Sequence, residues 1–188
     1  VGTAAGFGVL HPVFAQGFMT ALGSKSLYAS ATQDCSNKFA VANAIYGFPF
    51  TQPFPDLDHT QCLIIVGANP VISKWSFLQV PNPGRTLQEM KERGARIIVI
   101  DPRKTETAKV AGEHHFIRPN TDPFFYLAFL AELERQGGID RTRAEAQAEG
   151  IDEVLALART WTPERSEEVT TIPAATLREL VRVFRTSK

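Results

Sequence analysis

The chain has 188 residues, of which 44% are hydrophobic and 21% charged, which is ordinary globular usage and argues against disorder. Twenty basic and twenty acidic residues cancel, so net charge gives no reason to expect a nucleic-acid or anionic-membrane partner. The longest apolar runs are strand-sized and too short to span a bilayer, and the apolar first residues lack the basic region of a signal peptide.

The two cysteines, Cys35 and Cys62, have no CxxC partner. This segment alone is therefore not expected to hold an iron–sulfur cluster or a cysteine-type zinc site. The low cysteine content favours a reducing compartment. The chain begins without Met, which suggests a processed protein or a fragment.

Apolar residues at helical spacing predict a first helix over residues 3–22, followed by Gly23, and a second over 37–47, closed by Gly47. The next segment, 48–60, carries three prolines and no periodicity, which predicts a surface loop.

A buried strand is predicted over 61–67, then a short helix, an amphipathic helix over 85–94 and a second buried strand over 95–101. This order is a βαβ unit, which makes the sheet parallel. A shorter third strand is predicted over 114–119.

The next helix is predicted to begin with Asp122 as its N-cap and Pro123 as its first residue. Residues 140–188 predict a cap of amphipathic helices, with 162–171 connecting the last two. We therefore expect one α/β domain over 1–188, a three-layer αβα fold that is Rossmann-like, with a mainly parallel sheet and C-terminal helices.

Three polar segments follow the predicted strands, at 67–70, 101–107 and 119–122. Ligands of parallel sheets bind beyond the carboxyl ends of the strands, so the three segments are expected at one candidate site. There Arg103 can fork onto a phosphate, and Asp122 can accept two hydrogen bonds from the N1 and N2 edge of guanine. Each segment alone is also explained as a turn or a helix cap, but their shared edge favours a ligand site.

Other site chemistries have less support. No GxGxxG follows the first strand, and Asp101 lies 34 positions after Gly67 instead of roughly 20, so NAD binding is not expected. His114 and His115 are neighbours on a strand and point to opposite faces, which does not suit one shared metal. His11 is expected to pack in an apolar helix, and no serine stands in a GxSxG elbow.

These segments resemble the molybdopterin-guanine-dinucleotide oxidoreductases, the family of dimethyl sulfoxide reductase, periplasmic nitrate reductase and formate dehydrogenase. The matching motifs are TQDCSNKF, CLIIVGANPV, DPRKTETA and RPNTD, in family order, and the resemblance covers most of residues 20–188. The tail TWTPERSEEVTT is most similar to the formate dehydrogenase branch.

The resemblance implies that the chain is the αβα domain that binds the guanosine diphosphate arm of one of two pterin cofactors. The first segment would line the diphosphate and ribose, the second would contact the nucleoside, and Asp122 would bind guanine. The residues implied to bind the cofactor are Ser36, Lys38, Gly67, Ala68, Asn69, Pro70, Asp101, Pro102, Arg103, Thr105, Pro119 and Asp122.

The chain departs from the family pattern at three positions. Asn120 stands where glycine is usual, a change that the left-handed conformation of Asn tolerates. Ala40, six residues after Asp34, stands where the family has its protein ligand to the metal, as in the arsenite oxidase branch; a shifted register would recruit Cys35 instead. Val41 stands where formate dehydrogenases have a histidine, so the usual formate mechanism is not expected.

The complete enzyme is expected to be a molybdenum or tungsten oxidoreductase with bis-molybdopterin guanine dinucleotide (bis-MGD). Its 4Fe-4S cluster, its other domains and its electron-transfer iron–sulfur subunit would lie outside this segment, which we expect to be inactive alone. Two alternatives stay open. One is a cofactor-free relative comparable to the large subunit of respiratory complex I, and the other is a plain nucleotide-binding module.

Overall fold

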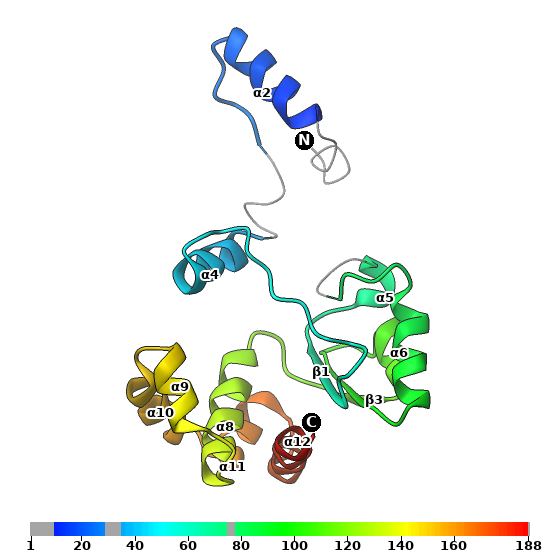
Figure 1. Cartoon of the computed structure of the whole chain (residues 1–188), viewed down its shortest axis with the longest axis vertical. Coiled ribbons are helices and arrows are strands. Elements are labelled where there is room, and N and C mark those ends of the chain that lie inside the picture. Colours follow the sequence, from blue (N-terminus) through cyan, green and yellow to red (C-terminus); the bar gives the residue numbers. More distant parts are fainter. Residues whose placement is uncertain (1–9, 29–34, 75–77, 188) are drawn as a thin grey trace. The chain divides into compact units, whose positions relative to one another are not determined.

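The computed structural model describes residues 10–28, 35–74 and 78–187 of the chain (Figure 1). Contacts divide the chain into two compact units, Val1–Pro53 and Phe54–Lys188, and each is described by itself. The single domain over 1–188 stays a prediction. Among the described residues, no helix has the length and apolar character needed to cross a membrane.

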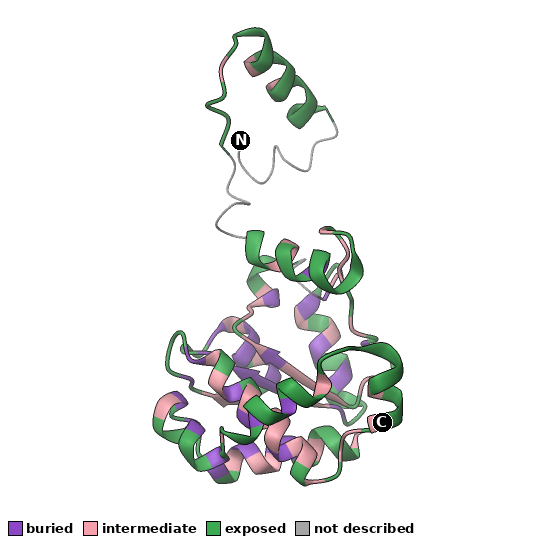
Figure 2. Cartoon of the chain, turned by 90° about the vertical axis from the view of Figure 1, so that its left-hand side faces the viewer, coloured by how far each residue is buried: buried purple, intermediate pink, exposed green. Residues whose placement is uncertain are grey.

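The first unit contains α2 (His11–Ala21) and α4 (Ser36–Tyr46). The first helix was predicted over 3–22, of which 3–9 lie outside the described residues. The helix α4 ends as predicted at Gly47, whose φ of 72° is in the left-handed region. Both helices are largely exposed in Figure 2.

The second unit is built on a three-stranded parallel sheet in the order β1-β2-β3. Its strands are β1 (Cys62–Val66), β2 (Arg96–Ile100) and β3 (Glu113–His115). The parallel βαβ prediction is confirmed for β1 and β2. The third strand is shorter than predicted and starts one residue earlier, pairing with β2 from Ile98↔Glu113.

One face of the sheet is covered by α5 (Pro70–Ser73), α6 (Pro83–Glu92) and α7 (Glu106–Ala111). The predicted helix over 85–94 begins two residues earlier, because Asn82 accepts from the backbone N–H of Arg85 and Pro83 occupies the first turn. The helix α7 was not predicted from the sequence. The core on this face contains Leu87, Met90, Ile97, Val99 and Ala108.

The other face is covered by α8 (Asp122–Arg135) and α12 (Ala174–Thr186). The helices α10 (Ile151–Arg159) and α11 (Pro163–Thr170) pack on α8, and α9 (Arg141–Gln147) is joined to α10 by the ion pair of Arg141 with Asp152. The helix α11 was predicted as a connection; it begins where Thr162 accepts from the N–H of Arg165. The core on this face includes Ile98, Ile100, Phe125, Leu177 and Leu180.

Side chains of β2 alternate between the two cores, Ile97 and Val99 on one face and Ile98 and Ile100 on the other. All four are nearly or fully inaccessible to solvent. The predicted three-layer αβα fold is therefore confirmed. The outer strand β1 also packs on both faces, but it is only partly buried because it lies at the edge of the sheet.

Candidate functional site

The carboxyl ends of the three strands lie at one edge of the sheet. The N–H of Gly67, just after β1, donates to the carbonyl of Ile100 at 2.9 Å. The N–H of Asp101, just after β2, donates to the carbonyl of His115 at 3.2 Å. The predicted meeting of the first two polar segments at the end of the sheet is thus observed.

Gly67 is exposed at this edge with φ of 63°, a conformation that favours glycine. No atom lies within 4 Å of the position that a Cβ would take there, so the backbone faces open space. The residues that follow Gly67 are less exposed. Ala68 packs against the core on the α6 side, and Pro70 is buried as the first residue of α5.

Asn69 is joined to the start of α7 by its side-chain amide. Its Oδ1 accepts from the backbone N–H of Thr107 at 3.2 Å and from the Thr107 hydroxyl at 2.7 Å. Its Nδ2 donates to the Glu106 carboxylate at 2.8 Å. This hydrogen bond is the main cause that lowers the pKa of Glu106, and the charge of Arg103 adds to it.

Asp101 is 8% exposed, and its carboxylate accepts from the N–H of Arg103 at 2.8 Å. This bond closes the turn through Pro102, which is exposed. The Arg103 guanidinium lies 3.6 Å from the Glu106 carboxylate and remains 63% exposed. Arg103 therefore has an ion-pair partner within the protein, while most of its guanidinium surface stays exposed.

Thr105 is 2% exposed, and its hydroxyl accepts from the N–H of Ala108 at 3.1 Å. It is the N-cap of α7, so its side chain stabilises the helix start. Thr107, in the same polar segment, is fully buried. Neither threonine side chain presents a surface to solvent.

The N-cap prediction for Asp122 is wrong by one residue. Thr121 occupies the N-cap position of α8, and its hydroxyl donates to the carbonyl of Arg118 at 2.6 Å. Asp122 is the first helical residue and is half-buried, and its carboxylate forms no hydrogen bond or ion pair with any residue that the structure describes. Side-chain capping therefore does not explain this carboxylate, although an acid in the first turn also stabilises the helix start.

The loop before α8 has the backbone expected of it. Asn120 has φ of 65°, in the left-handed region where the family usually places glycine, and Pro119 beside it is exposed.

The two adjacent histidines each have a partner within the protein. His114 Nε2 lies 3.0 Å from the carbonyl of Asp101, and His115 Nε2 lies 3.1 Å from the Glu113 carboxylate.

Ser36, Lys38 and Ala40 belong to the first unit. Ser36 begins α4, and the Lys38 ammonium lies 5.5 Å from the ring centroid of Phe39. Ala40 and Val41 are exposed on the same helix. Asp34, from which the metal-ligand position was counted, lies outside the described residues. Over the described ranges, no three His, Cys, Asp or Glu side chains are grouped as a metal site.

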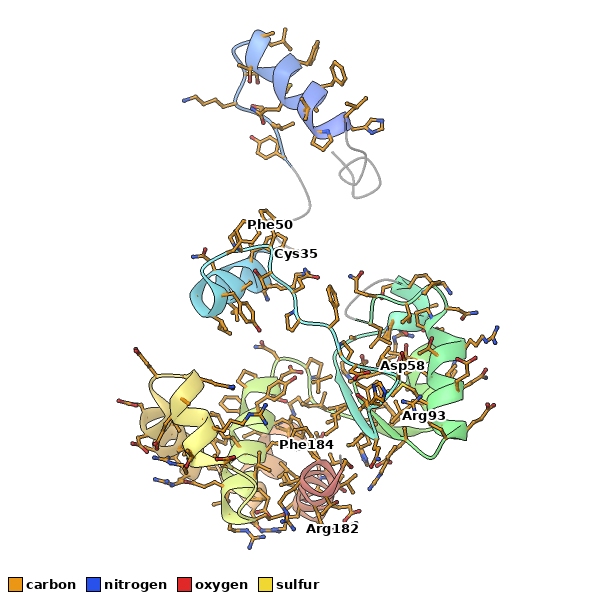
Figure 3. The ribbon with its side chains drawn as sticks, viewed as in Figure 1. Cys35, Phe50, Asp58, Arg93, Arg182 and Phe184 are labelled. Atoms are coloured by element: carbon orange, nitrogen blue, oxygen red, sulfur yellow. The ribbon has the colours of Figure 1, made fainter. Side chains whose placement is uncertain are left out.

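An open groove lies near the amino ends of β1 and β2, and Asp58 and Arg93 are two of its lining residues (Figure 3). Its arginines are engaged within the protein. Arg93 donates to the carbonyls of Leu57 and Thr60, and Arg96 pairs with Glu113 and Glu179. The opposite edge, with its open glycine and available carboxylate, is therefore the stronger candidate.

Proteins of known family have sequences similar to this chain. A family model described as molybdopterin oxidoreductase matches residues 3–141. The chain is 31% identical over 134 residues to the alpha subunit of a formate dehydrogenase of Methanococcus maripaludis, covering 71% of this chain and 19% of that protein. It is 37% identical over 115 residues to the assimilatory nitrate reductase catalytic subunit of Bacillus subtilis, covering 60% of this chain and 15% of that protein.

A solved structure shares the fold. Acetylene hydratase from Pelobacter acetylenicus matches 92% of this chain and 23% of its own with a TM-score of 0.73, at 22% sequence identity. The match spans 15–19% of the length of the two curated relatives just compared.

Proposed function

Because the chain belongs to the molybdopterin oxidoreductase family, we propose that its αβα unit binds the guanosine diphosphate arm of a molybdopterin guanine dinucleotide. The observation that carries this proposal is the carboxylate of Asp122, which is unpartnered within the described ranges, at the end of the sheet. Its carboxylate has no hydrogen-bond or ion-pair partner among the described residues, and it follows the third strand of the sheet, after an exposed turn. A carboxylate there suits the N1 and N2 donors of guanine.

The residues at this edge fit the rest of the nucleotide. The exposed backbone at Gly67 has room for a diphosphate, and the Arg103 guanidinium can donate two hydrogen bonds to a phosphate. Asp101 has a second carboxylate oxygen for a ribose hydroxyl, although little of its surface is exposed. Pro70 and Thr105 are buried, so their contribution would be to hold the two turns in place around the ligand.

In the full-length protein, we propose that two such cofactors hold molybdenum or tungsten, which supplies the redox or oxygen-atom chemistry when bound. This domain then contributes binding and orientation. Electrons would pass to a 4Fe-4S cluster outside this chain and to an iron–sulfur partner subunit. The substrate would be a small molecule; Ala40 and Val41 argue against the usual formate chemistry even though formate dehydrogenases are among the relatives.

The cofactor-free alternative is not favoured, because the relatives are named as formate dehydrogenases and nitrate reductases. The test is metal analysis with pterin fluorescence on the full-length protein, purified anaerobically. The proposal expects molybdenum or tungsten together with pterin, each in stoichiometric amount. A well-folded protein that lacks both would refute it.

A further inference from the structure

The side-chain amide of Asn69, expected from the resemblance to line the diphosphate, is bonded mainly to the protein itself. A backbone N–H can only donate and an ionised carboxylate can only accept, so its partners Thr107 and Glu106 fix which end of the amide is oxygen. The oxygen accepts two hydrogen bonds from Thr107, which fills both of its acceptor positions. Only one amide hydrogen remains for a ligand.

Thr107 is the centre of this connection. Its hydroxyl donates to Asn69 Oδ1 at 2.7 Å and accepts from the N–H of Val71 at 3.1 Å. Both bonds run from the first turn of α7 to the residues on either side of Pro70. Thr107 itself is 0% exposed, so it cannot contact a ligand. Any influence of its hydroxyl on binding must pass through Asn69 and the turn after β1.

We infer that Asn69 and Thr107 are positioning residues that fix the turn after β1 against the turn after β2. The two segments, 67–70 and 101–105, then meet the nucleotide as one preformed surface. Preformed geometry strengthens binding because little conformational freedom is lost when the ligand arrives. This inference rests on the proposed function and adds Thr107, a residue that holds the site without touching the nucleotide.

The test compares Thr107→Val with a matched control, Thr170→Val, in the full-length protein. Thr170 is also 0% exposed, and its hydroxyl likewise donates one hydrogen bond, to the Ser166 carbonyl at 2.7 Å, and accepts one, from Ile172 N–H at 3.2 Å. Both variants should lower the unfolding temperature of the cofactor-free protein by similar amounts. Only Thr107→Val should lose guanine nucleotide faster during timed dialysis, by roughly 10-fold, while Thr107→Ser retains it.

A second comparison separates positioning from direct contact. If Asn69 acts through the connection to Thr107, the double variant Asn69→Ala/Thr107→Val loses nucleotide more slowly than the two single effects combined predict, because only the Thr107 bond to Val71 is left to remove after Asn69→Ala. Additive losses would overturn the inference, as would equal nucleotide retention in Thr107→Val and Thr170→Val. Failure of the proposed function itself gives a different result, because the wild-type protein would then carry neither pterin nor guanine nucleotide.

Discussion

Asp122 is the residue whose surroundings bear most directly on guanine binding. Two hydrogen bonds from guanine to one carboxylate are worth about 1.5–3 kcal/mol each, so their loss should be large. We predict that Asp122→Asn, which keeps the shape but only one acceptor oxygen, lowers guanine-nucleotide retention in the full-length protein by roughly 10-fold or more. Retention is measured as guanosine monophosphate released by acid hydrolysis.

Asp58→Asn is the matched control for this substitution, because Asp58 is exposed and lies in the loop before β1. It should keep the full nucleotide load. Both variants should unfold near the wild-type temperature, since neither side chain is in the core. A full load in Asp122→Asn would show that another residue recognises the base.

Only part of the site could be predicted at the scale of single residues. The positions of Gly67, Arg103 and Asp122 follow from strand ends and turn residues, which are local signals. The role of Asn69 does not, because its partner Thr107 is 38 positions away and no local pattern joins the two. The N-cap of α8 was misplaced by one residue because Thr121 and Asp122 are both good N-cap residues.

At the scale of elements, the strands and the longer helices were predictable; of the short helices, α5 was predicted but α7 and α11 were not. The apolar runs of β1 and β2 and the periodicity of α6, α8 and α12 extend over enough residues to be distinct. The helices α7 and α11 have six and eight residues, so their apolar spacing is too brief to show. Their N-caps, Thr105 and Thr162, were the available signals.

The helices α8 and α12 are joined through a buried carboxylate, Glu132, which is 1% exposed. It accepts hydrogen bonds from Arg135 and Gln136, and Gln136 also donates to the carbonyl of Arg178 on α12 at 3.3 Å. We predict that Glu132→Gln lowers the free energy of unfolding by about 1–2 kcal/mol, because an amide presents one acceptor oxygen and turns a donor toward the others. Chemical denaturation measures this.

The neighbouring Glu134 on the same helix supplies the control. It pairs with Arg159 but is 26% exposed, so Glu134→Gln should cost about 0.5 kcal/mol or less. Equal losses in the two variants would mean that the burial of Glu132 is not what makes its hydrogen bonds important.

The ion pairs of Glu179 with Arg182 and Arg96 should make the stability of the fold depend on pH. Hydrogen bonds from Arg182, and then from Arg96, lower the pKa of Glu179 to about 2. An acid whose pKa is lowered by folding stabilises the fold above its ordinary pKa of about 4.3, and this contribution disappears as the pH falls toward the folded value. We therefore predict that wild type is more stable than Glu179→Gln at pH 6 and that the two converge as the pH falls from 4 toward 2. Unfolding curves that stay parallel over this range would contradict the assignment.

At the scale of the whole molecule, the order of strands and helices predicted the αβα layers, because a βαβ unit has few ways to bury both faces of its sheet. The division into two units was not predicted, since the helical pattern of 37–47 resembles that of a core helix. The structure buries only Ala42 in that helix.

Both hydrophobic cores lie within residues 57–181. We predict that a chain of residues 54–188 folds alone and unfolds cooperatively within about 4 °C of the 188-residue chain, the shift that roughly 1 kcal/mol produces. Thermal unfolding followed by circular dichroism tests this. A broad, non-cooperative transition in the shorter chain would show that the first unit completes its core.

The measurement that most directly tests nucleotide binding by this domain is the ratio of guanosine monophosphate to pterin released from the purified full-length protein. Molybdopterin guanine dinucleotide contains both in equal amounts, so the account predicts an equimolar ratio. Pterin released without guanosine monophosphate, or together with a different nucleotide, would contradict it.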